Sequence, residues 1–300
     1  MESTGQAVPA FVRLAAHPLR WRLLTELAGS DLRVRELVEL LGQPQNLVSY
    51  HLRLLREGGL VTAHRSSFDS RDSYYHLDLE RCAHALAATG AGLHPALHFA
   101  PTPLGPVATG TGLDPAPHFA PAPPRPVATG AGLPPAPHLD PTPPPPASAG
   151  RPARPRVLFT CTGNSARSPI AEALLRHRTG GHAEVTSAGS HPRAHLHPDA
   201  VRILHEDYGI DVGDQRPRHL DTLARRPFDY VISLCDKVRE VCPEFDGRPR
   251  RLHWSIPDPA AASRPDRAAF RHTAAQIDTR IRYLLPVLAT DPEVSHDDTG

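Results

Sequence analysis

The sequence predicts two folded domains: an α+β winged helix-turn-helix over residues 1–87 and an α/β domain with a doubly wound parallel sheet over 153–290. Three observations support this. The first part reads as helix, turn, helix and two strand-like runs. The middle part, 88–152, holds 19 of the 35 prolines and is predicted to be a disordered linker. The last part alternates strand-like and helix-like runs, and 291–300 reads as a frayed tail.

The overall composition narrows the function classes. The chain has 33 basic and 32 acidic residues and a formal net charge of +1, which argues against a strongly basic nucleic-acid coat but leaves room for a local DNA-binding face. No apolar run approaches membrane-spanning length, and the N-terminus has no basic segment followed by an apolar one. These features predict a cytoplasmic protein without a membrane partner, whose four cysteines are free, catalytic or redox-active.

The first domain is predicted element by element. Residues 17–29 carry apolar side chains at helical spacing and end at a glycine, and 34–42 form a second amphipathic run. A turn leads into a third helix over 45–59, which ends in a glycine pair. Strand-like runs follow at 60–68 and 72–79, joined by a polar turn. A β-hairpin after two helices joined by a turn is the layout of a winged helix-turn-helix.

The polar face of the third helix is the candidate DNA-reading surface, because short donors and acceptors suit base edges and phosphates. Its candidate residues are Gln45, Asn46, Ser49, Tyr50 and His51, with phosphate contacts expected from Arg53, Arg65 and Arg71. A solvated helix face, or a winged helix used only for protein contacts, remains the alternative. Ten arginines balance ten acidic residues in 1–87, so non-specific affinity is expected to be low.

This stretch resembles the ArsR-type repressors in AHPLRWRLLTELA and in QPQNLVSYHLRLLREGGLV. The resemblance implies a homodimer, formed through this domain, that binds operator DNA. Many members sense arsenite through cysteines near the second or third helix, but VRELVELLG has none. Cys82 is the domain's only thiol, whereas As(III) is best held by about three thiolates. Cys82 is therefore predicted to be a small buried apolar residue.

The linker is a tandem repeat of 20 residues, at 88–107, 108–127 and 128–147. Its proline density removes backbone donors, and each repeat has too few large apolar residues for a core. An extended, polyproline-rich spacer is predicted, and its histidines are too spread along the chain to predict a metal site. Because flexible tethers transmit effective concentration better than strain, the spacer argues against tight coupling between the domains.

The second domain opens with RVLFTC, a buried strand over 156–161, followed by a helix over 168–180. EVTSAG, YVISLC and RLHWSI are further strand-like runs separated by helical patterns, and a long helical run closes the domain. Sheets of this kind bind ligands at the carboxyl ends of their strands. Cys161 stands at such an end.

The loop after Cys161 is small and polar, and its N–H groups, together with the start of the next helix, suit a tetrahedral oxyanion. Both effects predict a lowered pKa for Cys161 and a thiolate nucleophile. Arg167 would clamp two oxygens, Ser168 would donate to the thiolate and Asn164 would brace the loop. The predicted oxyanion-binding residues are Thr162, Gly163, Asn164, Ser165, Ala166, Arg167 and Ser168. The alternative is an ordinary strand-to-helix turn with a buried cysteine.

TCTGNSARSPIAEA, TSAG (186–189) and IPDPA (256–260) resemble the low-molecular-weight protein tyrosine phosphatase superfamily, which includes the thioredoxin-coupled arsenate reductases. The resemblance covers about 130 residues and implies an arsenate or phosphate oxyanion as ligand. It also implies that Asp258 is the general acid that protonates the leaving oxygen. A turn residue between two prolines is the alternative for Asp258.

Two further cysteines, Cys235 and Cys242, separate the reductase from the phosphatase interpretation. Seven residues apart on a helix, they lie about 10 Å apart along its axis, whereas a disulfide needs Cα atoms within about 7 Å. Oxidation would therefore have to unwind the segment. Thioredoxin-coupled arsenate reductases carry the same three-cysteine arrangement. The resemblance implies a relay from Cys161 to Cys235 to Cys242, reduced by thioredoxin or a similar dithiol, with no bound cofactor. Two buried small residues are the alternative.

These observations favour one chain with two activities, a transcriptional regulator fused to an arsenate reductase. The loops around the predicted site lack the aromatic residues that grip a phosphotyrosine ring. Two alternatives stay open. One is a low-molecular-weight phosphatase fused to a DNA-binding regulator, and the other is a purely regulatory sensor of an oxyanion or of redox state.

Overall fold

The computed structural model describes residues 8–93, 154–261 and 266–290. The predicted spacer, from residue 94 onward, and the predicted frayed tail lie outside the described residues. The described residues of both folded domains fall within one compact unit. Within these ranges, no helix combines the length and the apolar character needed to cross a bilayer.

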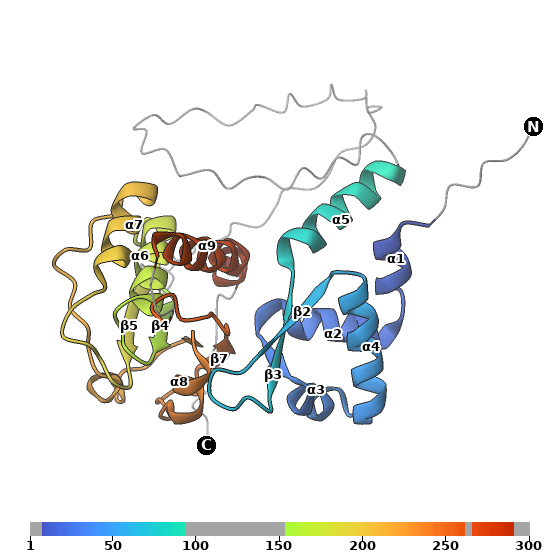
Figure 1. Ribbon diagram of the computed structural model, residues 1–300, viewed down its shortest axis with the longest axis horizontal. Coiled ribbons are helices and arrows are strands. Elements are labelled where there is room, and N and C mark those ends of the chain that lie inside the picture. Colours follow the sequence, from blue (N-terminus) through green and yellow to red (C-terminus); the bar gives the residue numbers. More distant parts are fainter. Residues whose placement is uncertain (1–7, 94–153, 262–265, 291–300) are drawn as a thin grey trace, which may run out of the picture. The chain divides into compact units, whose positions relative to one another are not determined.

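The first domain contains five helices and a small antiparallel sheet (Figure 1). The helices are α1 Ala10–Ala15, α2 Pro18–Gly29, α3 Val34–Leu41, α4 Gln45–Glu57 and α5 Leu79–Leu93. The strands are β1 Leu32–Arg33, β2 Val61–Arg65 and β3 Ser73–Leu77, in the order β1-β3-β2. The predicted helix-turn-helix and its hairpin are therefore present.

Local sequence explains most of these boundaries. The side chain of His17 accepts a hydrogen bond from the N–H of Leu19 at the start of α2, where Pro18 has no N–H that needs an acceptor. Gly42 ends α3 in the left-handed conformation, with φ 61°. Helix α5 continues past residue 87, where the linker was predicted to begin. Residues 88–93 contain no proline, so the helix loses no donor there.

The second domain is built on four parallel strands in the order β5-β4-β6-β7. They are β4 Arg156–Cys161, β5 Glu184–Gly189, β6 Tyr230–Ser233 and β7 Arg250–His253. The main helices are α6 Arg167–Thr179, α7 Pro198–Tyr208, α8 Asp236–Val241 and α9 Arg267–Thr290, with a short 3₁₀ turn, η1, at Leu220–Leu223. Figure 1 shows α6, α7 and α9 gathered beside the sheet, in agreement with their mutual contacts.

The apolar residues of the strands explain why helices pack against this sheet. Every residue of β4 after Arg156 is buried, as expected for a central parallel strand with both faces packed. Phe270, Ile277 and Ile281 of α9 are fully buried in the same core. The chain passes from β4 to β5 on one side and on to β6 on the other. Strand order thus reverses beside the end of β4, the place where such sheets bind ligands.

Candidate active site

Three candidate reactive side chains lie at or just after the carboxyl ends of three neighbouring strands. Cys161 is the last residue of β4, Cys235 comes two residues after β6, and Asp258 follows β7 by five residues. Because β4, β6 and β7 are adjacent and parallel, their carboxyl ends share one edge of the sheet. Tertiary structure therefore gathers residues nearly 100 positions apart at this edge.

The loop after Cys161 is held by its carbonyl groups. Backbone N–H groups of the 190–197 segment donate to the carbonyls of Cys161 (3.3 Å), Thr162 (2.9 Å), Gly163 (2.9 Å) and Ser165 (2.8 Å). In a planar trans peptide the N–H points opposite to the C=O, so the N–H groups after these carbonyls point away from that segment. Asn164 has φ 43°, the left-handed turn typical of backbone anion nests. The loop has the predicted form of an oxyanion cradle.

Asn164 is 1% exposed and braces this loop from within. Its amide donates to the hydroxyls of Ser168 (2.9 Å) and Ser187 (2.8 Å), and its side-chain oxygen accepts from the N–H of Arg218 (2.8 Å). All polar atoms of the amide are thus used, which fixes both its rotamer and the unusual backbone angle. From the resemblance to the arsenate reductases, Ser187 at β5 was expected, with Asn164 and Glu172, to match part of a potassium site that some of them hold, although no bound metal was predicted because the remaining acidic position falls near Arg218.

Cys161 itself is 2% exposed, and its Sγ lies 2.9 Å from the hydroxyl of Ser168. Burial raises the pKa of the Cys161 thiol above its ordinary value, while the Arg167 charge and the Ser168 hydrogen bond act in the opposite direction. The prediction of a lowered pKa is therefore wrong for this state of the site. The sequence indicated the favourable partners but not that the sulfur is wholly enclosed.

The raised pKa gives a pH dependence that can be measured. Only the thiolate reacts with iodoacetamide, so labelling of Cys161 should rise about tenfold per pH unit through the neutral range. Ser168→Ala removes a hydrogen bond that lowers the pKa, so it should slow labelling at any fixed pH below the plateau. Peptide-resolved mass spectrometry reports Cys161 separately, with Cys82 as the internal reference. A labelling plateau already reached below about pH 7 would contradict this account.

Arg167 begins α6 and connects the loop to the segment after β7. It is 7% exposed, and its guanidinium donates to the carbonyl of Ile256 and to the Asp258 carboxylate, both at 3.0 Å. Asp258 is more open, with 42% of its side chain exposed. The structure therefore places Asp258, the predicted general acid, next to Arg167, the predicted oxyanion-binding residue. The partial exposure of Asp258 leaves room for a substrate oxygen to reach it.

Cys235 and Cys242 flank helix α8 rather than lying on it, because α8 spans only the six residues between them. The prediction of one helix carrying both cysteines is corrected accordingly. Cys235 is 3% exposed, and its Sγ lies 3.3 Å from the hydroxyl of Thr162, the residue after Cys161. Cys242 is only partly buried. Burial raises its thiol pKa, opposed by the charge of Arg251.

A carboxylate on α6 supports the loop from behind. Glu172 is 1% exposed and accepts hydrogen bonds from Ser187 (2.6 Å) and Gln215 (2.6 Å), and it forms an ion pair with Arg176. Glu172 thus links to Asn164 through Ser187. Sequence patterns did not identify Gln215, which lies in an irregular segment.

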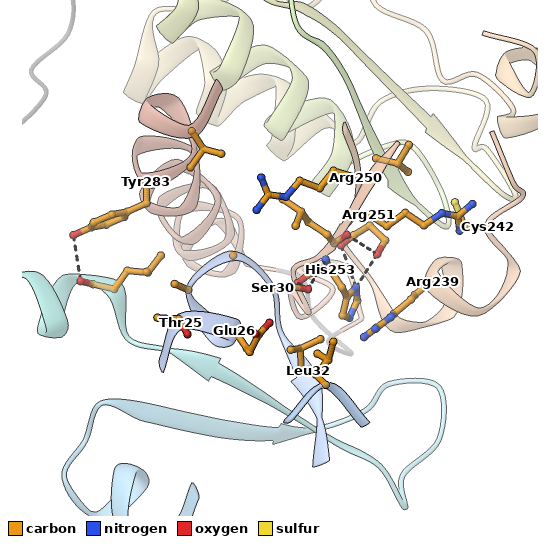
Figure 2. A pocket seen from close by; sticks show the side chains of 18 residues that line it. Thr25, Glu26, Ser30, Leu32, Arg239, Cys242, Arg250, Arg251, His253 and Tyr283 are labelled. Atoms are coloured by element: carbon orange, nitrogen blue, oxygen red, sulfur yellow. Dashed lines mark hydrogen bonds between the residues drawn. The ribbon is translucent and has the colours of Figure 1, made fainter. Parts of the chain in front are cut away.

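A cavity of about 660 Å³ lies beside Cys242 and is lined by both folded domains. Figure 2 shows Arg251 reaching toward Cys242, with Ser30 and His253 hydrogen-bonded nearby. No residue of the loop 161–168 lines this cavity, so it is distinct from the place where Cys161 would react.

On the first domain, the predicted DNA-reading residues separate into two groups. Exposed residues are Gln45, Asn46, Ser49, Tyr50, Arg53, Arg65 and Arg71. His51 is only 4% exposed and packs against His17, with ring centroids 4.3 Å apart. It shares the inward face of α4 with Val48 and Leu55, three residues before it and four after it. The prediction that His51 contacts DNA is therefore wrong in this structure.

Cys82 packs beside the core of this domain, and burial raises its pKa to about 11.

Comparisons with known proteins agree with both halves. Residues 156–294 match the family described as low molecular weight phosphotyrosine protein phosphatase, and residues 17–63 match the arsR family of bacterial regulatory proteins. An arsenate reductase of Halalkalibacterium halodurans is 35% identical over 129 residues, which cover 42% of this chain and 91% of that protein. An arsenate reductase of Shouchella clausii is 36% identical over 131 residues, covering 42% of this chain and 91% of the relative.

A solved structure, the thioredoxin-dependent arsenate reductase of Corynebacterium glutamicum, is 34% identical, with 45% of this chain and 62% of that chain covered and a TM-score of 0.37. The second domain of this chain belongs to the low molecular weight phosphotyrosine protein phosphatase family, close to its arsenate reductases, and is fused to a helix-turn-helix of the bacterial arsR family.

Proposed function

We propose that the chain is a bifunctional arsenic-response protein: a DNA-binding regulator fused to an enzyme that reduces arsenate to arsenite through three cysteines. The observation that carries the proposal is the place of Cys235, whose sulfur lies against the loop residue next to Cys161. A phosphatase needs Cys161 alone. A second buried thiol at the same edge of the sheet serves a chemistry that ends in a disulfide.

In the first step the loop N–H groups and Arg167 hold the arsenate oxygens, and the sulfur of Cys161 attacks arsenic. Burial disfavours the thiolate, so the thiol must lose its proton as the oxyanion binds, and Ser168 stabilises the sulfur through its hydrogen bond. Asp258 protonates the oxygen that leaves as water. Its contact with Arg167 supports this role, because the same guanidinium would hold the neighbouring oxygens.

In the second step Cys235 attacks the sulfur of Cys161, the electron pair of the S–As bond passes to arsenic, and arsenite leaves. Cys242 then attacks Cys235, which frees Cys161 and produces a Cys235–Cys242 disulfide. The partial exposure of Cys242 supports its role as the thiol that reaches the outside. A thioredoxin-like dithiol returns the pair to the reduced form.

In the first domain, α4 and the turn between β2 and β3 would bind operator DNA through their exposed polar and basic residues. We propose that the domain acts as a homodimer. Helix α5 has no buried residue, and Leu86 and Leu93 on it are 52% and 77% exposed. Exposed large apolar side chains on one helix suit a protein interface.

The test of the enzyme is NADPH consumption with arsenate, thioredoxin and thioredoxin reductase, set beside hydrolysis of an aryl phosphate by the same preparation. Arsenate-dependent turnover that is lost in Cys161→Ser is the expected result. Steady hydrolysis of the aryl phosphate without arsenate turnover would make the protein a phosphatase. Negligible turnover of both, with DNA binding that responds to arsenate or oxidation, would leave a regulatory sensor.

DNA binding is tested by Arg53→Gln. Arg53 is exposed on α4, so its loss should weaken binding to a mixed-sequence duplex several-fold and lower the salt slope by about one. The control is Arg271→Gln, a half-exposed arginine on α9 that pairs with Asp207. Fluorescence anisotropy across a salt series measures both quantities. Equal slopes for the wild type and Arg53→Gln would place the DNA elsewhere.

A further inference from the structure

We propose that disulfide formation between Cys235 and Cys242 is transmitted to the winged helix-turn-helix, because helix α8, which lies between these cysteines, anchors the wing turn. The inference rests on the proposed three-cysteine relay. In this proposal, the conformation of the wing turn in the first domain depends on the redox state of the second domain.

The most direct link joins the first residue of α8 to the turn between β2 and β3. Asp236 directly follows Cys235, and its Oδ2 accepts hydrogen bonds from the N–H of Ser67 (2.6 Å) and from the hydroxyl of Ser67 (3.0 Å). Ser67 lies two residues after the end of β2, in the turn flanked by Arg65 and Arg71. The candidate phosphate-binding arginines therefore lie on either side of Ser67, the residue that is hydrogen-bonded to Asp236 of the second domain.

Asp236 is an integral part of a buried polar cluster. It is 2% exposed, and its other oxygen accepts from the hydroxyl of Ser255 (2.6 Å) and pairs with Nε2 of His253 (3.1 Å). Burial opposes its ionisation, but hydrogen bonds from His253, Ser255 and Ser67 outweigh burial and lower the pKa of Asp236. A buried carboxylate held by this many donors does not give up one of them without cost.

Two residues of the second turn of α8 also contact the first domain. Arg239 donates to Glu36 on α3 (2.7 Å), and its guanidinium lies 5.3 Å from the ring centre of Tyr74 on β3. Glu240 accepts from Arg33 on β1 (2.9 Å). Helix α8 thus reaches the first helix of the helix-turn-helix motif, its small sheet and its wing turn. These contacts give the two domains a direct route for coupling that does not depend on the spacer.

Disulfide formation is incompatible with this helix. Its six residues rise about 9 Å, so the flanking cysteines are too far apart for a disulfide, whose Cα atoms lie within about 7 Å. Closing the S–S bond breaks two S–H bonds and removes two protons and two electrons. During turnover As(V) takes up the electrons to become As(III), and one oxygen leaves as water. Unwinding α8 moves Asp236, Arg239 and Glu240 out of register with their partners.

The amide of Ser67 is the reporter, because its hydrogen bond crosses from the wing to Asp236. The full-length variant Cys82→Ser with Cys161→Ser keeps only the pair Cys235 and Cys242. Diamide takes two hydrogens from that pair, and intact mass confirms the disulfide. Hydrogen exchange of Ser67, resolved to the residue, should be at least about tenfold faster in the oxidised form. The amides of the β2–β3 ladder serve as the internal control.

A matched control carries Cys242→Ser in addition and receives the same oxidant, and its Ser67 exchange should stay slow. Asp236→Ala in the reduced protein removes the acceptor and should expose Ser67 without oxidation. A disulfide that forms while Ser67 stays protected would overturn the coupling and leave the relay intact. Failure of the two thiols to form a disulfide would overturn the relay and the coupling together.

Discussion

Replacement of Cys242 by serine is expected to reduce arsenate turnover to about one arsenite per protein chain. The mutant keeps Cys161, Arg167 and Cys235, so it performs the attack on arsenate and releases the first arsenite. It then stops as a Cys161–Cys235 disulfide, because no third thiol attacks it. That disulfide is enclosed, since both sulfurs belong to residues no more than 3% exposed.

The measurement is the NADPH-coupled assay with thioredoxin, in which the mutant should show a single burst and no steady phase. Cys82→Ser is the matched control: the same chemical change at a thiol of the first domain should leave turnover near the wild-type rate. Steady turnover by Cys242→Ser would mean that thioredoxin reduces the first disulfide directly, and the relay would then have two cysteines.

Gly189→Ala is expected to lower the turnover number by about 100-fold, the scale associated with a displacement of about 1 Å at a reacting centre. Gly189 ends β5 and pairs with Cys161 across the sheet. A Cβ at this position would lie 2.6 Å from the carbonyl oxygen of Thr162 and 2.9 Å from the backbone nitrogen of Asn164. Both are backbone atoms of the oxyanion loop, so the loop itself has to move.

Gly29→Ala is the control for the loss of glycine as such, because a Cβ there meets only a leucine methyl group at 3.9 Å. Thermal unfolding separates the two effects, since overpacking costs about 1–3 kcal/mol and leaves most of the protein folded. A folded Gly189→Ala variant with wild-type turnover would show that the loop position near β5 does not matter for the chemistry.

Local patterns in the sequence predicted the helix-turn-helix, the hairpin and the strands of the parallel sheet, and they marked the residues proposed to react. Strands β4 and β5 coincide with the strand-like runs RVLFTC and EVTSAG, and glycines end α3, α6 and α7. The small loop between β4 and α6 was recognisable because a strand, a nest-forming turn and a helix start adjoin in the chain. These features depend on residues within a few positions of one another, so they can be read without the fold.

Tertiary packing decided the remaining properties. The spacing to Val48 and Leu55 places His51 on the inward face of α4, but its packing against His17 was decided by where α2 and α4 meet. The raised pKa of Cys161 comes from enclosure by several segments, which no local pattern reports. Asp236 and Ser67 lie 169 positions apart, so their bond exists only once β6 and the β2–β3 turn are in place. Burial and long-range hydrogen bonds depend on which elements pack together in the fold. The residues adjacent in the chain do not determine that packing.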